Sequence, residues 1–305
     1  MTFCTVTGTP SRPHRRTAVG ALILLGAIVG AWSPTGPARA AQAAPVDTTA
    51  TAVDTTDIAV DTTAAAVDTL PAHGELQPRV NNVWGPGEKM VFSISYGVVN
   101  AGEGILEVLG LKEYQGHTCY QIQSKANSNR FFSSFYKVRD KIISYIDTEY
   151  LVSRYFYKRL REGDYKKTVE ISFDHETGQA LYADGHDLPI VPGIQDVLSA
   201  FFYVRTLDLA PGKVYHVPAH SSRKTYDLRV IVHERERVEV EAGTWDCFVV
   251  EPVIEGEGLF KHEGKLTLYL TDDEYRIPVM IKTKVPVGSI DVELKEYRPG
   301  RVLSR

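Results

Sequence analysis

The sequence has little cysteine and, beyond its first forty residues, no long hydrophobic run. Only 3 of its 305 residues are cysteine, which argues against a small fold held together by several disulfides. No later segment has eighteen consecutive apolar residues, so we expect no transmembrane span in the mature chain. An excess of basic residues is also missing, since the formal net charge is −4. This balance argues against nucleic acid as a partner.

Common catalytic motifs are absent as well. There is no Gly-x-Ser-x-Gly elbow, no His-Glu-x-x-His pair and no glycine-rich phosphate loop. Residues 221–224 have a Ser-x-x-Lys spacing, but the Ser-Asp-Asn and Lys-Thr-Gly elements that accompany it in penicillin-binding enzymes are missing. A catalytic or metal site would require His216 and His220 to converge with the acidic residues 272–274. We therefore expect a non-catalytic protein without metal or cofactor.

The first forty residues have the three parts of a secretory signal peptide. A basic stretch with Arg12, Arg15 and Arg16 precedes an apolar run at residues 17–32, and Ala-Arg-Ala at residues 38–40 fits a cleavage site. A membrane anchor is the alternative, but the run is shorter than the roughly 20 apolar residues that cross a bilayer. We expect cleavage after residue 40 and export to the periplasm or the extracellular space.

Residues 41–75 differ from everything that follows them. They consist mainly of Ala, Val, Asp and Thr, and the unit Val-Asp-Thr begins at residues 46, 53, 60 and 67. The segment carries six acidic side chains and no basic one. Because it has too little to bury to offset its ordering entropy, we expect a disordered acidic linker. The remaining residues, 76–305, are nearly balanced, with 30 basic and 32 acidic side chains.

Residues 76–305 have the pattern of a β-sheet domain. Short runs of Val, Ile, Tyr, Phe and Thr are separated by Gly, Asp and Pro, and residues 89–96 alternate with the period of a half-buried strand. Residues 196–207 break this rule, because their apolar side chains recur every three or four positions. We expect a mainly β fold: a curved antiparallel sheet or half-barrel with one central amphipathic helix.

The β domain also contains similar stretches in the same order. Residues 116–122 resemble residues 243–250, and about thirty positions later residues 145–150 resemble residues 269–275. Repetition in the same order indicates a duplicated structural unit. We therefore expect two pseudo-repeated halves, at about residues 87–174 and 212–298, joined by the helix.

Four further segments carry a family resemblance. They are residues 87–103, 196–205, 243–248 and 271–279, and in their order and spacing they resemble the DUF3108 family of bacterial exported proteins of unknown function. The resemblance implies an all-β envelope domain and brings no catalytic residues. The strand pattern of residues 269–278 is also similar to that of LolA-like lipid and lipoprotein carriers, an analogy of fold alone.

Basic and aromatic side chains gather between residues 125 and 170. This stretch has eleven basic and six acidic residues, with aromatic residues interleaved. If its strands bury the rings and expose the charges, the basic face could attract anionic lipid or glycan; otherwise it is an ordinary amphipathic sheet. Aromatic residues of the helix could line a pocket or simply fill the core. The candidate ligand-binding residues are Phe131, Phe132, Tyr136, Arg154, Tyr157, Arg159, Phe201 and Phe202.

Two cysteines remain after signal cleavage, Cys119 and Cys247. In an oxidising compartment they could form a disulfide, or each could be a small buried hydrophobe. Cys4 precedes the apolar run of the signal, where a lipid-attachment cysteine would not lie.

These features favour a non-catalytic envelope protein that binds a lipid or another envelope component. The alternative is a scaffold or assembly module that docks on another envelope protein, which an exposed apolar patch would favour. A cavity inside the curved sheet would favour the binding protein, and its lining would identify the residues involved.

Overall fold

The computed structural model describes residues 75–254, 266–284 and 288–303. The predicted signal peptide, residues 1–40, and the predicted linker up to residue 74 lie outside the described residues. Within the described ranges, no helix has the length and apolar character needed to span a membrane. The described ranges fall almost entirely within the predicted β domain.

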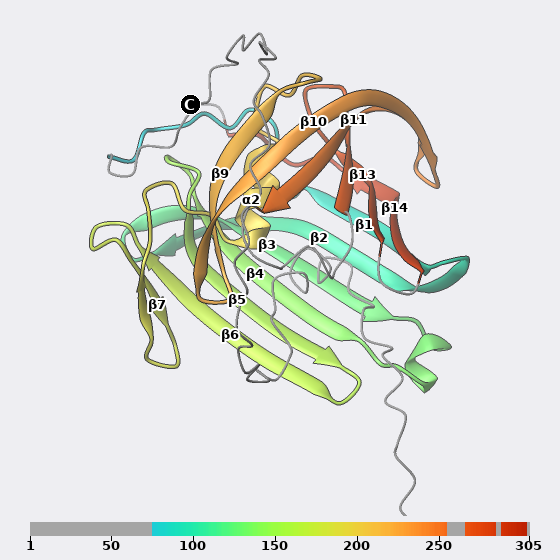
Figure 1. The fold of residues 1–305 in the computed structure, drawn as a ribbon, viewed down its shortest axis with the longest axis horizontal. Coiled ribbons are helices and arrows are strands. Elements are labelled where there is room, and N and C mark those ends of the chain that lie inside the picture. Colours follow the sequence, from blue (N-terminus) through green and yellow to red (C-terminus); the bar gives the residue numbers. More distant parts are fainter. Residues whose placement is uncertain (1–74, 255–265, 285–287, 304–305) are drawn as a thin grey trace, which may run out of the picture.

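One antiparallel sheet contains all fourteen strands of the described residues, which confirms the mainly β prediction (Figure 1). The strands are β1 Lys89–Tyr96, β2 Val99–Tyr114, β3 His117–Ser128, β4 Arg139–Asp147, β5 Ser153–Glu162, β6 Tyr165–Asp174, β7 Gln179–Tyr182, β8 Asp187–Pro189, β9 Val214–Ser221, β10 Lys224–Val240, β11 Gly243–Ile254, β12 Leu266–Thr271, β13 Pro278–Lys284 and β14 Ser289–Arg298. Their order in the sheet is β8-β7-β6-β5-β4-β3-β2-β1-β14-β13-β12-β11-β10-β9. Neighbouring strands are therefore consecutive in sequence everywhere except at the β1–β14 pair.

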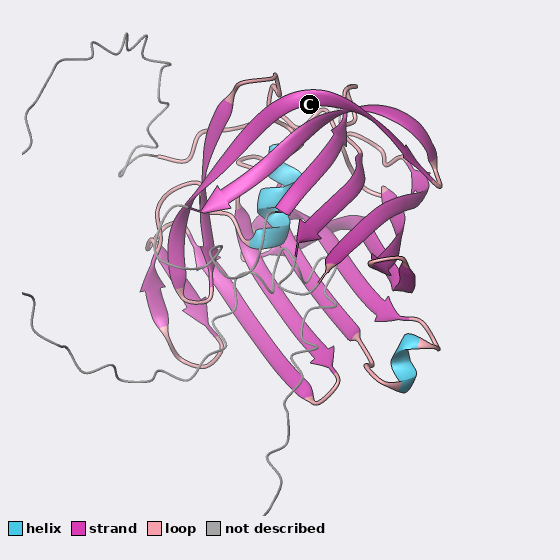
Figure 2. Ribbon diagram, turned by 45° about the vertical axis from the view of Figure 1, so that its right-hand side comes forward, coloured by secondary structure: helices cyan, strands magenta, loops and turns pink. Residues whose placement is uncertain are grey.

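The sheet curves until its two ends face each other, with the helix α2 (Val197–Val204) enclosed between them (Figures 1 and 2). The edge strands β8 and β9 do not pair, so the sheet is a half-barrel with a gap between the β6–β8 end and the β9–β10 end, which we call the seam. Gln195 lies beside one end of the seam. Its N–H donates to the Pro218 carbonyl at 2.9 Å, and its carbonyl accepts from the His220 N–H at 2.8 Å.

Backbone hydrogen bonds repeat between the two halves of the sheet. The Gly87 N–H donates to the Val108 carbonyl at 2.8 Å where β1 meets β2, and the Gly212 N–H donates to the Val232 carbonyl at 2.8 Å where β9 meets β10. The long strands β2 and β10, of 16 and 17 residues, each show a register shift immediately after that contact. Strands β1–β6 therefore correspond to β9–β14, as the predicted pseudo-repeat requires.

The turn after the fourth strand of each half is also repeated. The Asp147 carboxylate accepts from two backbone N–H groups of its own turn at 2.8 and 3.0 Å, and the Asp273 carboxylate does so at 2.9 and 3.0 Å. Both turns continue through a residue with positive φ, Leu151 at 53° and Arg276 at 48°. A short carboxylate that bonds the backbone ahead of it explains why the two sequences are similar here.

The predicted helix is present and begins at its aspartate. Asp196 caps α2 by accepting from two N–H groups of the first turn at 2.7 and 3.0 Å, and the hydroxyls of Ser144 and Ser153 donate to its other oxygen. Seven of the eight residues of α2 are buried. The helix is enclosed more completely than its periodicity alone indicates, because the curved sheet covers it from opposite sides.

A buried ion pair fixes the other end of the helix. The Arg205 guanidinium donates to both oxygens of Glu88, just before β1, at 2.7 and 2.8 Å, and both side chains are fully buried. The Trp84 indole N–H also donates to the Phe202 carbonyl at 3.0 Å. These contacts join the helix to the place where β1 of the first half meets β14 of the second.

Candidate functional site

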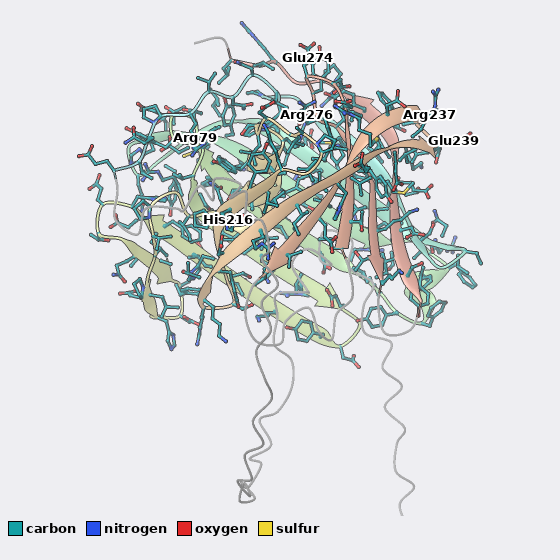
Figure 3. The ribbon with its side chains drawn as sticks, turned by 45° about the horizontal axis from the view of Figure 1, so that its top comes forward. Arg79, His216, Arg237, Glu239, Glu274 and Arg276 are labelled. Carbon is teal, nitrogen blue, oxygen red and sulfur yellow. The ribbon has the colours of Figure 1, made fainter. Side chains whose placement is uncertain are left out.

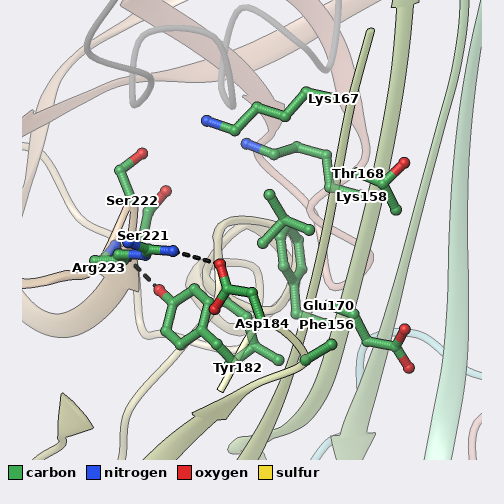
Figure 4. A pocket seen from close by; sticks show the side chains of 13 residues that line it. Phe156, Lys158, Lys167, Thr168, Glu170, Tyr182, Asp184, Ser221, Ser222 and Arg223 are labelled. Carbon is green, nitrogen blue, oxygen red and sulfur yellow. Dashed lines mark hydrogen bonds and ion pairs between the residues drawn. The ribbon is translucent and has the colours of Figure 1, made fainter. Parts of the chain in front are cut away.

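A cavity of about 510 Å³ lies at the seam (Figure 4). Strands β5 and β6 form one wall, and the β7–β8 and β9–β10 turns form the other. A cavity of this size falls within the range of roughly 300–1,000 Å³ that is usual for small-molecule sites. Its lining residues are Phe156, Lys158, Lys167, Thr168, Val169, Glu170, Ile171, Tyr182, Ala183, Asp184, Ser221, Ser222 and Arg223.

The β5–β6 wall is partly apolar. Phe156 on β5 and Ile171 on β6 are register partners and are both buried. Val169 is the register partner of Lys158 on the same inward face. Thr168 and Glu170 alternate with the inward-facing residues of β6, and Figure 4 shows these two side chains pointing away from the cavity. The cavity therefore combines apolar surface with the polar groups of the remaining lining.

Lys158 is the unusual member of this wall. Its side chain is only 3% exposed, yet no described residue forms a hydrogen bond or an ion pair with its ammonium group. Burial and the neighbouring Lys167 lower the pKa of Lys158 to about 7. Figure 4 shows both lysines extending toward the turn on the opposite wall. Two lysines that extend into the same space, neither of them in an ion pair with a described residue, favour an anion between the walls.

Two carboxyl groups lie on the inward face next to Lys158. Asp140 on β4 and Glu162 at the end of β5 are both buried, and one oxygen of each has no hydrogen-bond partner. Burial and the charge of Asp140 raise the pKa of Glu162, and burial also raises the pKa of Asp140. Both groups act on Lys158 as negative charges that oppose the fall in its pKa.

The opposite wall is a tight hairpin turn with an unusual backbone. Ser222 and Arg223 connect β9 to β10 with φ values of 50° and 64°, a region that residues other than glycine, asparagine and aspartate rarely adopt. The Ser222 hydroxyl is buried and has no hydrogen-bond partner. Backbone outliers of this kind often occur at binding sites, where the surrounding structure holds them in place.

Contacts across the seam hold this turn. The Tyr182 hydroxyl on β7 accepts from the Arg223 N–H at 3.0 Å and contacts His220 Nε2 at 2.9 Å. The Arg223 guanidinium forms an ion pair with Asp184. Burial lowers the pKa of His220 to about 4, so this histidine is neutral at physiological pH. The turn and β7 thus form a fixed wall opposite the two lysines.

None of the eight candidate residues predicted from the sequence lines the cavity. Phe132, Phe201 and Phe202 are in the hydrophobic core, and Phe131 is 67% exposed beside the short 3-10 helix η1 (Phe132–Ser134). Tyr136 packs against the core near the β5–β6 turn. The remaining three, Arg154, Tyr157 and Arg159, are on β5.

On β5, rings and charges are not separated between the two faces of the strand. Arg154 and Lys158 are buried on the same side of the strand as Phe156, whereas Tyr157 and Arg159 are on the other side. The buried Arg154 has a structural partner, since its guanidinium contacts the Asp147 carboxylate at 2.9 Å. The inward face therefore carries both charges and rings, because a cavity and an ion pair accommodate the charges there.

Cys119 and Cys247 do not form the disulfide considered from the sequence. Both thiols are free and buried, on β3 and β11, and five strands of the sheet separate these two strands. Burial raises the pKa of each thiol to about 12, so both remain protonated. Their equivalent positions in the two halves agree with the other interpretation, in which each is a small buried hydrophobe.

The histidines and acidic residues that a catalytic or metal site would require do not converge. His216 contacts Asp227 at 2.6 Å, His220 contacts Tyr182, and Asp272 pairs with Arg235. Figure 3 shows His216 and Glu274 on separate parts of the surface. Within the described part of the chain, no group of three or more His, Cys, Asp or Glu residues could hold a metal ion.

A similar fold occurs in a crystal structure of a beta-barrel-like protein of the DUF1849 domain from Brucella abortus. It covers 72% of this chain and 100% of its own, with 10% sequence identity and a TM-score of 0.52. A putative exported protein with a YmcC-like fold from Bacteroides fragilis and a putative lipoprotein from Parabacteroides distasonis each cover 71% of this chain and 97% of their own, with 11% identity and a TM-score of 0.31. No curated protein matches the sequence.

A protein-family model also matches the chain. The model described as "Protein of unknown function (DUF3108)" matches residues 91–295, which extend from β1 to β14 and include both walls of the cavity. The segments whose order and spacing resemble this family lie on β1–β2, α2, β11 and the β12–β13 turn. The chain therefore belongs to the DUF3108 family.

Proposed function

We propose that this protein is exported and binds an anionic amphiphile, a lipid first of all, in the seam cavity without catalysing a reaction. The ligand would place its carboxylate or phosphate group between Lys158, Lys167 and the Ser222–Arg223 turn. Its apolar part would lie along Phe156 and Ile171. The family relationship and the signal-like first forty residues support an envelope location.

The observation that carries this proposal is the amino group of Lys158, whose side chain lines the cavity, is only 3% exposed and forms no ion pair or hydrogen bond with a described residue. Burying an amino group without an ion pair is costly, so a purely structural wall would not favour lysine at this position. An oxyanion would supply the missing counter-charge to both lysines and could accept a hydrogen bond from the unpartnered Ser222 hydroxyl. Asp184 is already paired with Arg223, so it does not supply this charge to the lysines.

Lys158→Met tests the proposal against a matched control. Lys166→Met removes a lysine from the neighbouring strand β6, but on its exposed outer face. A fluorescent long-chain fatty acid and a lysophospholipid with a phosphate monoester head group are suitable probes, and inorganic phosphate distinguishes a head-group site from an amphiphile site. We expect Lys158→Met to weaken binding of the amphiphiles at least about 30-fold, as loss of one partner of a buried charge pair commonly does.

Lys166→Met should leave the binding of both amphiphiles unchanged. Equal affinities of wild type and Lys158→Met would refute the site. Tight binding of inorganic phosphate, with no gain from an acyl chain, would refute the amphiphile but retain the oxyanion. Native mass spectrometry of protein purified from its own compartment provides a separate check, because a bound lipid would be released only from protein with an intact cavity.

A further inference from the structure

Four exposed apolar side chains lie at one end of the sheet. Val98 in the β1–β2 turn is fully exposed, and Val99 at the start of β2 is 43% exposed. Phe131 and Phe135, on either side of η1, are 67% and 60% exposed. We call these four residues the apolar tip. Figure 2 shows η1 as the short helix at this end of the sheet, away from α2.

Hydrogen bonds hold the two loops of the apolar tip side by side. The Asn129 side-chain amide donates to the Asn100 carbonyl at 2.8 Å, and the Asn129 N–H donates to the Ala101 carbonyl at 2.9 Å. Residues 98–100 and 129–135 therefore form one surface, although about thirty positions separate them in the sequence.

The exposed rings are held firmly. Phe132, between them, is buried in the core, and its N–H donates to the Asn129 side-chain oxygen at 2.8 Å. The Tyr136 N–H donates to the Phe132 carbonyl at 2.8 Å, which closes the turn. The rings of Phe131 and Phe135 are 5.6 Å apart in an edge-to-face arrangement. A turn that is ordered in this way yet keeps two phenyl rings in water indicates a surface that something else covers.

Three basic side chains lie next to Phe131 and Phe135 in the sequence. Arg130, Lys137 and Arg139 are all exposed. Arg139 donates to backbone carbonyls at 2.6 and 3.0 Å, so no carboxylate neutralises it there. Of the acidic residues on the adjoining strands and turns, Glu103 lies 3.9 Å from Lys295, and Asp164 in the β5–β6 turn is exposed. Exposed apolar side chains with cations beside them match a surface that is apolar inside and anionic at its boundary.

We propose that the apolar tip docks on an anionic lipid membrane. Phe131, Phe135, Val98 and Val99 enter the boundary between head groups and acyl chains, and the neighbouring Arg and Lys side chains contact lipid phosphates. In this proposal the side chains enter only the interfacial layer, as in a peripheral membrane contact. A groove on a partner protein would also bury the rings, but the three cations beside them favour a lipid surface. The inference goes beyond ligand binding in the cavity and does not depend on it.

Vesicle cosedimentation tests the proposal. The vesicles contain phosphatidylcholine alone, or phosphatidylcholine mixed with phosphatidylglycerol. The first variant is Phe131→Ala/Phe135→Ala. Its control is Leu109→Ala/Leu111→Ala. These two leucines are 44% and 48% exposed and lie toward the end of β2 that is opposite to the apolar tip. The second variant, Arg130→Gln/Lys137→Gln, removes two of the cations.

Wild type should bind the anionic vesicles more tightly than the neutral ones. We expect the double phenylalanine variant to lower the partition coefficient about tenfold, and each removed cation to lower it about fivefold in a salt-sensitive way. The leucine control and Lys158→Met should bind like wild type, so loss of cavity binding and loss of docking can be told apart. Unchanged vesicle binding by the double phenylalanine variant would overturn the proposal. It would also be overturned if wild type bound no vesicles, or if the rings were found covered by a partner protein.

Discussion

Lys158 places an amino group on the buried, inward face of β5. Burial disfavours its ammonium form, and the nearby Lys167 disfavours it further. Glu162 and Asp140 face the same group and favour the charge, but neither forms an ion pair with it. The result is a lysine that titrates near neutral pH rather than near 10.5. A bound anion would raise this pKa, so ligand and proton should bind together.

The first prediction at the residue scale is therefore a pH dependence of binding. We expect affinity for the amphiphile to fall as pH rises through about 7, with about a tenfold loss for each further pH unit until another group dominates. Glu162 adds to the trend, because its pKa is raised and it gains negative charge in the same direction of pH. Titration calorimetry at several pH values in two buffers measures both the affinity and the proton uptake.

The free energy of unfolding of the ligand-free protein should rise with pH, whereas the affinity for the ligand should fall. Between about pH 7 and pH 10.5 the folded protein holds fewer protons at Lys158 than the unfolded chain does. The stability penalty of burying Lys158 therefore disappears as pH rises through that range. Lys158→Met should flatten this part of the stability profile. An affinity that did not depend on pH, together with an unchanged stability profile in the variant, would show that Lys158 is not a titrating ligand contact.

Lys158 also shows what sequence reasoning can miss at a single residue. The basic and aromatic character of residues 125–170 is visible in the sequence, but both faces of β5 contain rings and charges. A period of two groups Arg154, Phe156 and Lys158 on one face, yet it does not say which face is inside. Only the position of β5 beside the seam decides that, and it depends on strands more than fifty residues away.

At the scale of elements, the β9–β10 turn combines strain with function. A two-residue hairpin with positive φ at both positions favours Asn-Gly, and this chain has Ser222 and Arg223 instead. Such positions cost on the order of 1 kcal/mol or more each when the residue has a side chain. Ser222 and Arg223 give the cavity a hydroxyl and a guanidinium group. These groups would benefit ligand binding, but they do not recover the stability that the strained turn loses.

Replacing this turn should separate stability from binding. We expect Ser222→Asn/Arg223→Gly to raise the free energy of unfolding by about 1 kcal/mol, because both residues then suit the backbone. The same variant should bind the amphiphile more weakly, since two groups of the wall are lost. Urea denaturation and the fluorescent fatty-acid titration measure the two effects. A variant that became more stable and bound as tightly as wild type would show that the turn is not part of the site.

The helix shows which part of an element can be predicted. The sequence pattern predicts a helix over residues 196–207, and its start is correct because Asp196 is a favourable cap followed by apolar periodicity. The observed end, at Val204, is three residues earlier. Arg205, the residue that follows the helix, bonds through its side chain to Glu88, which is more than one hundred residues earlier in the chain. The local pattern does not contain that contact.

At the scale of the whole molecule, one buried ion pair connects the parts of the fold. Arg205 follows α2, Glu88 precedes β1, and the Tyr297 hydroxyl on β14 donates to Glu88 at 3.3 Å. Two backbone carbonyls also accept from Arg205, each at 3.1 Å. The helix, the first strand of the first half and the last strand of the second half are therefore held at one point.

Removing one member of this pair should be strongly destabilising. We expect Arg205→Met to lower the free energy of unfolding by about 3–5 kcal/mol, because it leaves the Glu88 carboxylate buried without its partner. The double variant Glu88→Leu/Arg205→Met should recover a large part of that loss. Lys213→Gln removes an exposed ion pair with Asp208 and should change stability little. Urea denaturation of the four proteins measures these differences, and a small effect of Arg205→Met would contradict the role assigned to the pair.

The sequence predicts the pairing of strands that follow one another in the chain, but not the pairing of strands that are far apart in it. Alternation and turns predict an antiparallel sheet in which consecutive strands pair, and the repeat predicts two equivalent halves. The β1–β14 pair and the position of the open seam involve segments that are far apart in sequence, so no local pattern indicates them. The cavity lies at that seam, which explains why the residues predicted to bind a ligand differ from the residues that line it.

The most direct test of the account is a titration of wild type, Lys158→Met and Lys166→Met with the fluorescent long-chain fatty acid near neutral pH. Tight binding by wild type and Lys166→Met, with at least about a 30-fold weaker affinity for Lys158→Met, is the predicted result. The melting temperature of each variant establishes that it is folded. Equal binding by all three folded proteins, or no binding of the fatty acid or the lysophospholipid by wild type, would contradict the central claim that the seam cavity holds an anionic amphiphile.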